Sequence, residues 1–238
     1  MQISEENGWQ VTADRYVGFI DIMGFKNLVA HSIHEEIYDM MQEIEHVIKS
    51  NENMTWGNEG KMLKSTFFSD SIVLYSKDGS RASARAIGLA LSSLSSDLIL
   101  RGVPHKGALA FGKMTLDYEK SIFFGQPLID AYLLQEELLM YGVVVHSSAE
   151  RELEKLKTEN YFLFDHLCPF KGGSSHHYTI PPMDVWNVST FSFEEQKWLT
   201  KEVKKFRHRT SGHTRKYIDN TETFLKTFIE FENNKKQL

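Results

Sequence analysis

The first part of the chain alternates apolar and polar segments in a way that predicts short strands and amphipathic helices. Residues 15–23 are rich in Tyr, Val, Phe and Ile and are followed by Gly24, which is typical of a strand that ends in a turn. Apolar side chains between Ile33 and Ile48 then recur at helical spacing. The polar segment 50–60 is predicted to be a loop.

Two further strands are predicted at Lys61–Phe68 and Ser71–Ser76, close enough in sequence to form a hairpin with Asp70 at its tip. Leucines and an isoleucine at helical spacing predict a helix at about 80–99. A strand interrupted at Gly112, a helix and a last strand are expected over 104–118, 125–139 and 142–147. The order β-α-β-β-α-β indicates an α+β, split βαβ (ferredoxin-like) fold, an antiparallel sheet with helices on one face.

The pattern changes near residue 150. We expect a charged helix at Glu150–Lys157, strand-like pieces at Tyr161–Phe164 and Tyr178–Ile180, and helices near 193–206 and 214–232. The segment "GGSSHH", 172–177, is predicted to be a loop, because adjacent histidines lack the spacing of a metal pair. Residues 1–150 are therefore predicted to be the core, and 151–238 a helical C-terminal extension packed on it.

Composition narrows the class of protein. A chain of 238 residues with 41% hydrophobic residues can form one large domain, and a formal net charge of -5 gives no general attraction to nucleic acid. The basic stretch 204–216 has one aromatic residue, Phe206, which argues against an RNA-binding surface. We predict a cytoplasmic protein, because the chain has a single cysteine and no signal-like N-terminus. The chain lacks an apolar run of ~20 residues, so we expect no membrane partner, and no nucleic-acid partner either.

Two carboxylates interrupt apolar runs that otherwise look like buried strands. Asp21 lies within "YVGFIDIMGF" and Asp70 within "STFFSDSIVLY". The element order can bring them side by side, and a shared divalent cation is the simplest way to balance two adjacent carboxylates. Such a site suits two-metal phosphoryl transfer, and the following Met23, Gly24 and Phe25 open a helix whose N–H groups can bind phosphate. Taken singly, each aspartate is more often a turn former or a helix cap than a metal ligand, and only the pair favours a metal site.

Four motifs together resemble the class III nucleotidyl cyclases, and most closely the small bacterial pyrimidine (uridylate or cytidylate) cyclases of Pycsar antiphage defence. They are "FIDIMGF", "FFSDSIVLYS", "GVPHKGALAFG" and "FFGQPLIDAYLLQEEL", within residues 15–147. The resemblance implies a homodimer with active sites at the subunit interface. It also implies two Mg²⁺ or Mn²⁺ ions per site and conversion of a nucleoside triphosphate to a 3′,5′-cyclic monophosphate and pyrophosphate. The product would be read by a separate effector protein.

The same resemblance assigns individual residues. Asp21 and Asp70 match the two catalytic, metal-binding aspartates, and the carbonyl of Ile22 matches a backbone metal ligand. Lys113, after Gly112, occupies the place of a basic triphosphate-binding residue, although a solvated surface lysine is the alternative.

The sequence departs from the purine-specific members of the family at the base. Thr66 and Ile122 occupy the two base-reading positions and cannot supply the usual adenine or guanine contacts. Lys64 and Phe68 share the Thr66 side of a regular strand, so these three are the candidate base-binding residues, with ordinary strand packing as the alternative. We therefore expect a pyrimidine substrate, with UTP or CTP left open and a lean toward UTP because Lys64 can donate to a uracil carbonyl.

A second departure concerns turnover. The transition-state Asn and Arg of the family fall on Ile129 and Leu133, which removes charge stabilisation of the reacting phosphate. Either the metal ions and another basic residue such as Lys106 suffice, or the protein is a nucleotide-binding sensor or interaction module without catalysis. The resemblance to pyrimidine cyclases favours activity.

Overall fold

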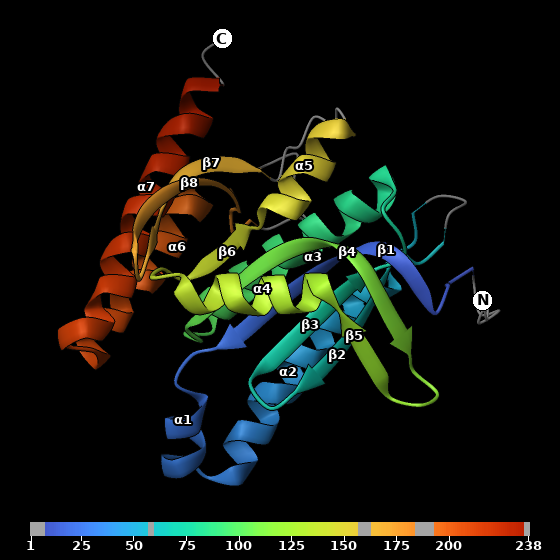
Figure 1. The fold of residues 1–238 in the computed structure, drawn as a ribbon. Helices are drawn as coiled ribbons and strands as arrows, with labels where there is room; N and C mark the ends of the chain where they lie inside the picture. Colours follow the sequence, from blue (N-terminus) through green and yellow to red (C-terminus); the bar gives the residue numbers. More distant parts are fainter. Residues whose placement is uncertain (1–7, 57–59, 157–162, 184–192, 236–238) are drawn as a thin grey trace.

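The computed structural model describes residues 8–56, 60–156, 163–183 and 193–235, and these form one eight-stranded sheet with helices on both faces (Figure 1). The strand order is β2-β3-β1-β4-β6-β8-β7, and β5 pairs with β4. The strands are β1 (Thr12–Ile22), β2 (Leu63–Phe68), β3 (Ser71–Ser76), β4 (His105–Asp117), β5 (Ile122–Gly125), β6 (Gly142–Val145), β7 (Phe164–Phe170) and β8 (Gly173–Ile180). The α-helices are α1 (Phe25–His31), α2 (His34–Asn53), α3 (Arg81–Leu100), α4 (Gln126–Glu137), α5 (Ser147–Lys155), α6 (Phe193–Lys205) and α7 (Arg215–Lys235).

The mixed α+β class and the β-α-β-β-α-β order expected from the sequence are confirmed, but the prediction of helices on one face is wrong. Strand β1 is apolar on both sides, with Val17 and Phe19 in one buried cluster and Tyr16 and Ile20 in another. Helices α2 and α3 cover the second cluster, whereas α4 covers the first (Figure 1). A continuous apolar run such as that of β1 is typical of a strand buried on both faces.

The sheet is not wholly antiparallel, which corrects a second expectation. Strand β6 runs parallel to β4, in a register that places Gly142 opposite Lys106. Parallel neighbours require a long crossover connection. The hairpin to β5 and the helix α4 supply it, so α4 lies along β4 and ends beside Lys106.

Strand β4 is longer than the sequence suggested. Its ladder with β1 continues through Gly112, which lies opposite Arg15, so the predicted break is absent.

Strand β5 was not predicted, because four residues are too few to produce a periodic signal. Helix α2 also continues to Asn53, into the predicted 50–60 loop.

The C-terminal part adds to the same sheet. Residues 172–177, predicted to be a loop, belong mainly to β8, which pairs with β6 and with the edge strand β7. The Ser and His side chains of this segment hide its strand character, because pairing with β7 decides it rather than β-propensity. Of the strand predicted at Tyr161–Phe164, residues 161–162 lie outside the described residues.

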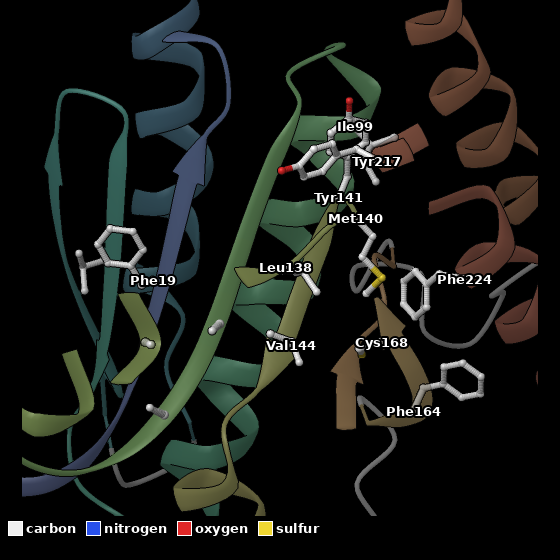
Figure 2. Close-up of a cluster of buried hydrophobic side chains, with 14 of the residues drawn as sticks. Phe19, Ile99, Leu138, Met140, Tyr141, Val144, Phe164, Cys168, Tyr217 and Phe224 are labelled. Carbon is white, nitrogen blue, oxygen red and sulfur yellow. The ribbon is translucent and has the colours of Figure 1, made fainter. Parts of the chain in front are cut away.

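One apolar cluster joins this part to the core. Phe164 of β7 and Phe224 of α7 have ring centroids 6.1 Å apart, and Tyr141 stacks on Tyr217 of α7 at 5.9 Å (Figure 2). The cluster extends to Phe19 of β1. None of the described helices is long and apolar enough to cross a membrane.

The close approach of β1 and β4 provides a test of the packing. A Cβ at Gly107 would lie 2.6 Å from the Phe19 carbonyl oxygen and 2.9 Å from Ile20 Cγ1. We expect Gly107→Ala to lower the free energy of unfolding by about 2 kcal/mol in urea titrations, because the backbone of β1 must shift. Gly172→Ala is the control, since a Cβ there meets nothing within 4 Å. Equal stability of the two variants would contradict this packing.

Candidate active site

The end of β1 brings the two predicted carboxylates together. Asp21 is paired across the sheet with Ser71 of β3 on one side and Lys106 of β4 on the other. Asp70 lies in the tight turn between β2 and β3, where Ser69 adopts a positive φ of 56°. The Ile22 N–H donates to the Asp70 carbonyl oxygen at 2.8 Å, so the backbone holds the turn against β1.

The charge on Asp21 is disfavoured where it lies. Burial raises the pKa of its carboxyl group, and the neighbouring charges of Asp70 and Glu136 raise it further, whereas Lys106 lowers it. A cation between Asp21 and Asp70 would relieve both the repulsion and the desolvation.

The donor set fits a metal that also binds substrate. Among the described residues there is no group of three or more His, Cys, Asp or Glu side chains that could hold a metal ion. Two carboxylates with a backbone carbonyl such as that of Ile22 form an incomplete cage. Mg²⁺ commonly binds in this way, with waters and phosphate oxygens as the remaining ligands.

Lys106 places a buried positive charge next to Asp21. Its side chain is 8% exposed, and its Nζ lies 3.3 Å from the Glu136 carbonyl oxygen and 3.4 Å from Glu136 Oε1. Lys171, in the turn between β7 and β8, approaches the same carboxylate at 3.8 Å. Glu136 and Lys171 were not identified from the sequence, because only the ends of α4 and of the β7–β8 hairpin bring them here.

The amides of Met23, Gly24 and Phe25, predicted to bind phosphate, are not all free to do so. Gly24 precedes α1 in the left-handed conformation, and Phe25 is the first helical residue. The Met23 N–H, however, donates to the Pro104 carbonyl oxygen at 2.8 Å. The phosphate-binding role predicted for the Met23 amide is therefore not available, and only the Gly24 and Phe25 amides remain candidates.

Lys113 lies far from Asp21 along the sheet. It pairs with Asp14, seven residues from Asp21 along β1. At the rise of a strand this is about 23 Å. Within one chain Lys113 is therefore too far away to bind a phosphate beside Asp21, and its predicted phosphate contact stays a prediction for a site that a second chain completes.

The predicted base-binding residues divide into two places. Phe68 is exposed and lies in the same cross-strand row as Ser71 and Asp21. Lys64 pairs with Tyr75, four residues along β2 from Phe68 and hence about 13 Å away. Thr66 lies between them, so Lys64 and Phe68 do not share one base within a chain.

Helix α4 presents an apolar stripe to solvent. Ile129, Tyr132 and Leu133 are all exposed and share one face of the helix. Glu136 continues this face next to Lys106. The two positions where the sequence lacks the expected Asn and Arg thus lie on the surface, on the same side of the sheet as Asp21.

No protein-family model and no curated protein matches the sequence. Solved structures with a similar arrangement include the catalytic core of a rhodopsin–guanylyl cyclase with converted specificity in complex with ATPalphaS (12% identity, TM-score 0.49, 71% of this chain and 96% of that one). A bacterial light-regulated adenylyl cyclase is similar at 13% identity and a TM-score of 0.49, over 82% of this chain and 98% of that one.

The adenylyl cyclase CyaB from P. aeruginosa is similar at 15% identity and a TM-score of 0.46, over 71% of this chain and 95% of that one. At these identities and TM-scores, the likeness assigns no activity to this chain. The chemistry is inferred from the residues of the site.

The raised pKa of Asp21 predicts how stability changes on substitution. A carboxyl whose pKa is higher in the folded than in the unfolded state favours folding when protonated, and this contribution is lost as pH rises through the folded pKa. Without divalent cations, Asp21→Asn should therefore raise the melting temperature at about pH 7, and less at acidic pH.

Mg²⁺ or Mn²⁺ should stabilise the wild type and not Asp21→Asn, because binding to the folded state alone raises stability. Asp39→Asn, at an exposed position on α2, is the control. A wild-type melting curve unchanged by both cations would argue against a metal at Asp21.

Proposed function

We propose that the protein is a nucleotidyl cyclase that converts a pyrimidine nucleoside triphosphate to its 3′,5′-cyclic monophosphate and pyrophosphate. The observation that carries the proposal is the pair Asp21 and Asp70 with the buried Lys106 beside them. Two carboxylates that repel each other, next to a cation, suit a metal-bound triphosphate better than a purely structural role.

Each residue has a defined task in this reaction. Asp21 and Asp70, with the Ile22 carbonyl, would hold Mg²⁺ or Mn²⁺. When bound, the two ions would activate the ribose 3′-hydroxyl and stabilise the leaving pyrophosphate. Lys106 is close enough to Asp21 to affect its pKa, and its ammonium can balance the negative charge of the phosphates. The 3′-oxygen forms a bond to the α-phosphorus, the bond to the β-phosphate bridging oxygen breaks, and the 3′-hydroxyl proton leaves to solvent.

A homodimer is part of the proposal. The sequence resemblance implies active sites at the subunit interface, and Lys64 lies about 13 Å along β2 from the row of Phe68 and Asp21. The exposed apolar stripe on α4 is the kind of surface that marks an interface. A two-fold pair would make two equivalent sites. The signalling role in antiphage defence, and an effector that reads the product, rest on the sequence resemblance alone.

One observation favours a second candidate, a nucleotide-binding sensor without catalysis. Ile129 and Leu133 cannot stabilise a developing phosphate charge. A sensor would retain the metal and nucleotide sites and release no pyrophosphate.

Incubation with each of the four NTPs and Mn²⁺, followed by mass spectrometry, separates the two functions. We expect cUMP or cCMP with one equivalent of pyrophosphate, and a loss of at least about 100-fold in rate for Asp70→Asn, because a metal ligand is removed. The exposed Asp39→Asn should retain the wild-type rate. Nucleotide binding without any cyclic product would establish the sensor, and a preference for ATP or GTP would overturn the pyrimidine assignment.

The interface can be tested independently. Leu133 and Leu167 have similar exposures, 56% and 51%, but only Leu133 lies on the α4 stripe. We expect Leu133→Glu to convert the dimer to a monomer in sedimentation velocity and to abolish turnover, because a charge is buried without a partner at the interface. Leu167→Glu should remain dimeric and active. A fully active monomer would refute the shared active site.

A further inference from the structure

A surface groove between α6 and α7 has no role in the site described so far. The two helices pack against each other at the β7 edge of the sheet (Figure 1). The groove has a volume of ≈ 780 Å³, within the range of small-molecule sites. Its lining includes Lys201, Lys204 and Arg207 on one side and Lys226, Glu230 and Asn233 of α7 on the other. We call it the α6–α7 groove.

The two walls of this groove are held in place by buried side chains beneath it. Leu199 and Val203 of α6 and Ile218, Leu225 and Phe228 of α7 belong to one buried apolar cluster. The groove is therefore formed by the packing of the protein itself, and a ligand that enters it need not order the two helices.

Arg207 lies at the end of the groove where the lining residues of α7 begin, and its charge is already balanced. Its Nε donates to Glu222 Oε1 at 2.8 Å, and its Nη2 forms an ion pair with Asp219. The Arg207 carbonyl oxygen accepts from Arg215 Nη2 at 2.9 Å, which fixes the turn between the helices. Two of the carboxylates in the groove are thus taken up by one guanidinium.

Two lysines of α6 have no such partner. Lys201 and Lys204 are exposed, and among the described residues neither ammonium makes a hydrogen bond or an ion pair. They are three residues apart on a helix, so their Cβ atoms are about 5–6 Å apart and their like charges repel. Both can reach one anion placed in the groove.

The charges of the groove are segregated between its walls. The acidic lining residues Asp219, Glu222 and Glu230 all belong to α7, whereas the α6 wall is cationic. Lys226 of α7 is 4.0 Å from Glu230 Oε1, an exposed pair that contributes little. A phosphate monoester carries about −1.5 to −2 charges at pH 7 and would balance the two unpaired ammoniums of α6.

The rest of the groove suits a polar organic group rather than a protein helix. Its lining on α7 runs from Asp219 to Asn233, about 21 Å at the rise of a helix, so a phosphate fills only part of it. Glu230 can accept hydrogen bonds from hydroxyls, and the Asn233 amide can both accept and donate. Among the described lining residues Ile229 alone is apolar, whereas a docked helix needs several apolar anchors.

We infer that the α6–α7 groove binds a phosphate monoester of ribose or of a nucleoside, with Lys201 and Lys204 on the phosphate. The lining of the groove shares no residue with the candidate active site, so the binding does not depend on the cyclase activity proposed above. The alternative is that these lysines only offset the negative end of the α6 dipole.

Binding is measured by calorimetry with ribose 5-phosphate, uridine 5′-monophosphate and ribose. EDTA is present, so that no metal-bound nucleotide forms at Asp21 and Asp70. We expect at least one of the two phosphates to bind with one site per chain, and ribose not to bind. The tighter of the two identifies the source of the phosphate. Lys204→Gln should weaken this binding about tenfold or more, because a charged hydrogen bond is lost.

Lys205→Gln is the matched control. It removes the same charge from the same helical turn, but Lys205 pairs with Glu202 at 2.6 Å and does not line the groove. This variant should bind as the wild type. Equal weakening by Lys204→Gln and Lys205→Gln would reduce the lysines to a general field or a dipole effect and overturn the inference, as would the absence of binding by both phosphates.

Two further measurements locate the site and define the ligand. Asp70→Asn should bind the phosphates as the wild type, whereas its loss of binding would place them at the candidate active site and overturn the inference. Cyclic uridine monophosphate, a diester with a single charge, should bind more weakly than uridine 5′-monophosphate, and a preference for the diester would overturn the monoester assignment. A protein that binds the monoester without cyclising any nucleotide would support the inference and refute the cyclase.

Discussion

The pairing of β1 with strands on both of its sides is the constraint on which the rest of the structure depends. Because β3 and β4 flank it, β1 has no free edge, and both of its faces are covered by helices. A charged side chain on such a strand must find its partner on a face of the sheet or at a strand end. Asp21 lies where β1 ends, between Ser71 and Lys106, and this position alone brings the turn of Asp70 and the end of α4 to one place.

The position of Asp21 at the end of β1 determines which charges surround it. Asp21 and Asp70 repel, Glu136 adds to the repulsion, and Lys106 offsets part of it. The contacts of the buried Lys106 ammonium with Glu136 are long, at 3.3 and 3.4 Å, so these two side chains do not form a tight pair. A site with mismatched charges of both signs is poorly suited to stabilising the fold and well suited to a ligand with bound cations and anionic phosphates.

The sequence predicted those features that leave a local signal. The strand ending at Asp21, the hairpin around Asp70 and the helices from 80 to 99 and 125 to 139 follow from apolar periodicity and turn residues, and the structure has each of them. Strand β8 was predicted only at its end, Tyr178–Ile180, because the Ser and His residues before it carry no strand signal and only pairing orders them. The helices on both faces and the parallel β4–β6 pair were missed because both depend on the path of the chain rather than on any one segment.

In the candidate site, too, only residues with a local signal in the sequence could be predicted. Asp21 and Asp70 were recognisable because each carboxylate breaks an apolar run. The distance of Lys113 from Asp21 within the chain could not be predicted, because its neighbours in sequence say nothing about which row of the sheet it joins. Arg15 was not singled out, although it also opens a buried strand, because a charge at a strand start is normally solvated. In the structure it is buried, and Trp9 lies over its guanidinium, with Arg15 Cζ 5.5 Å from the ring centroid.

The two unusual charges of β1 lie at opposite ends of the strand. Burial raises the pKa of Asp21 and lowers that of Arg15 to about 10, so neither charge is favoured where it lies. The two residues are six apart, which is about 20 Å along a strand. The base and the α-phosphate of a nucleotide are separated by one sugar, far less than this, so a nucleotide whose α-phosphate lies at Asp21 does not place its base at Arg15 of the same chain. The two charges therefore need separate physical explanations.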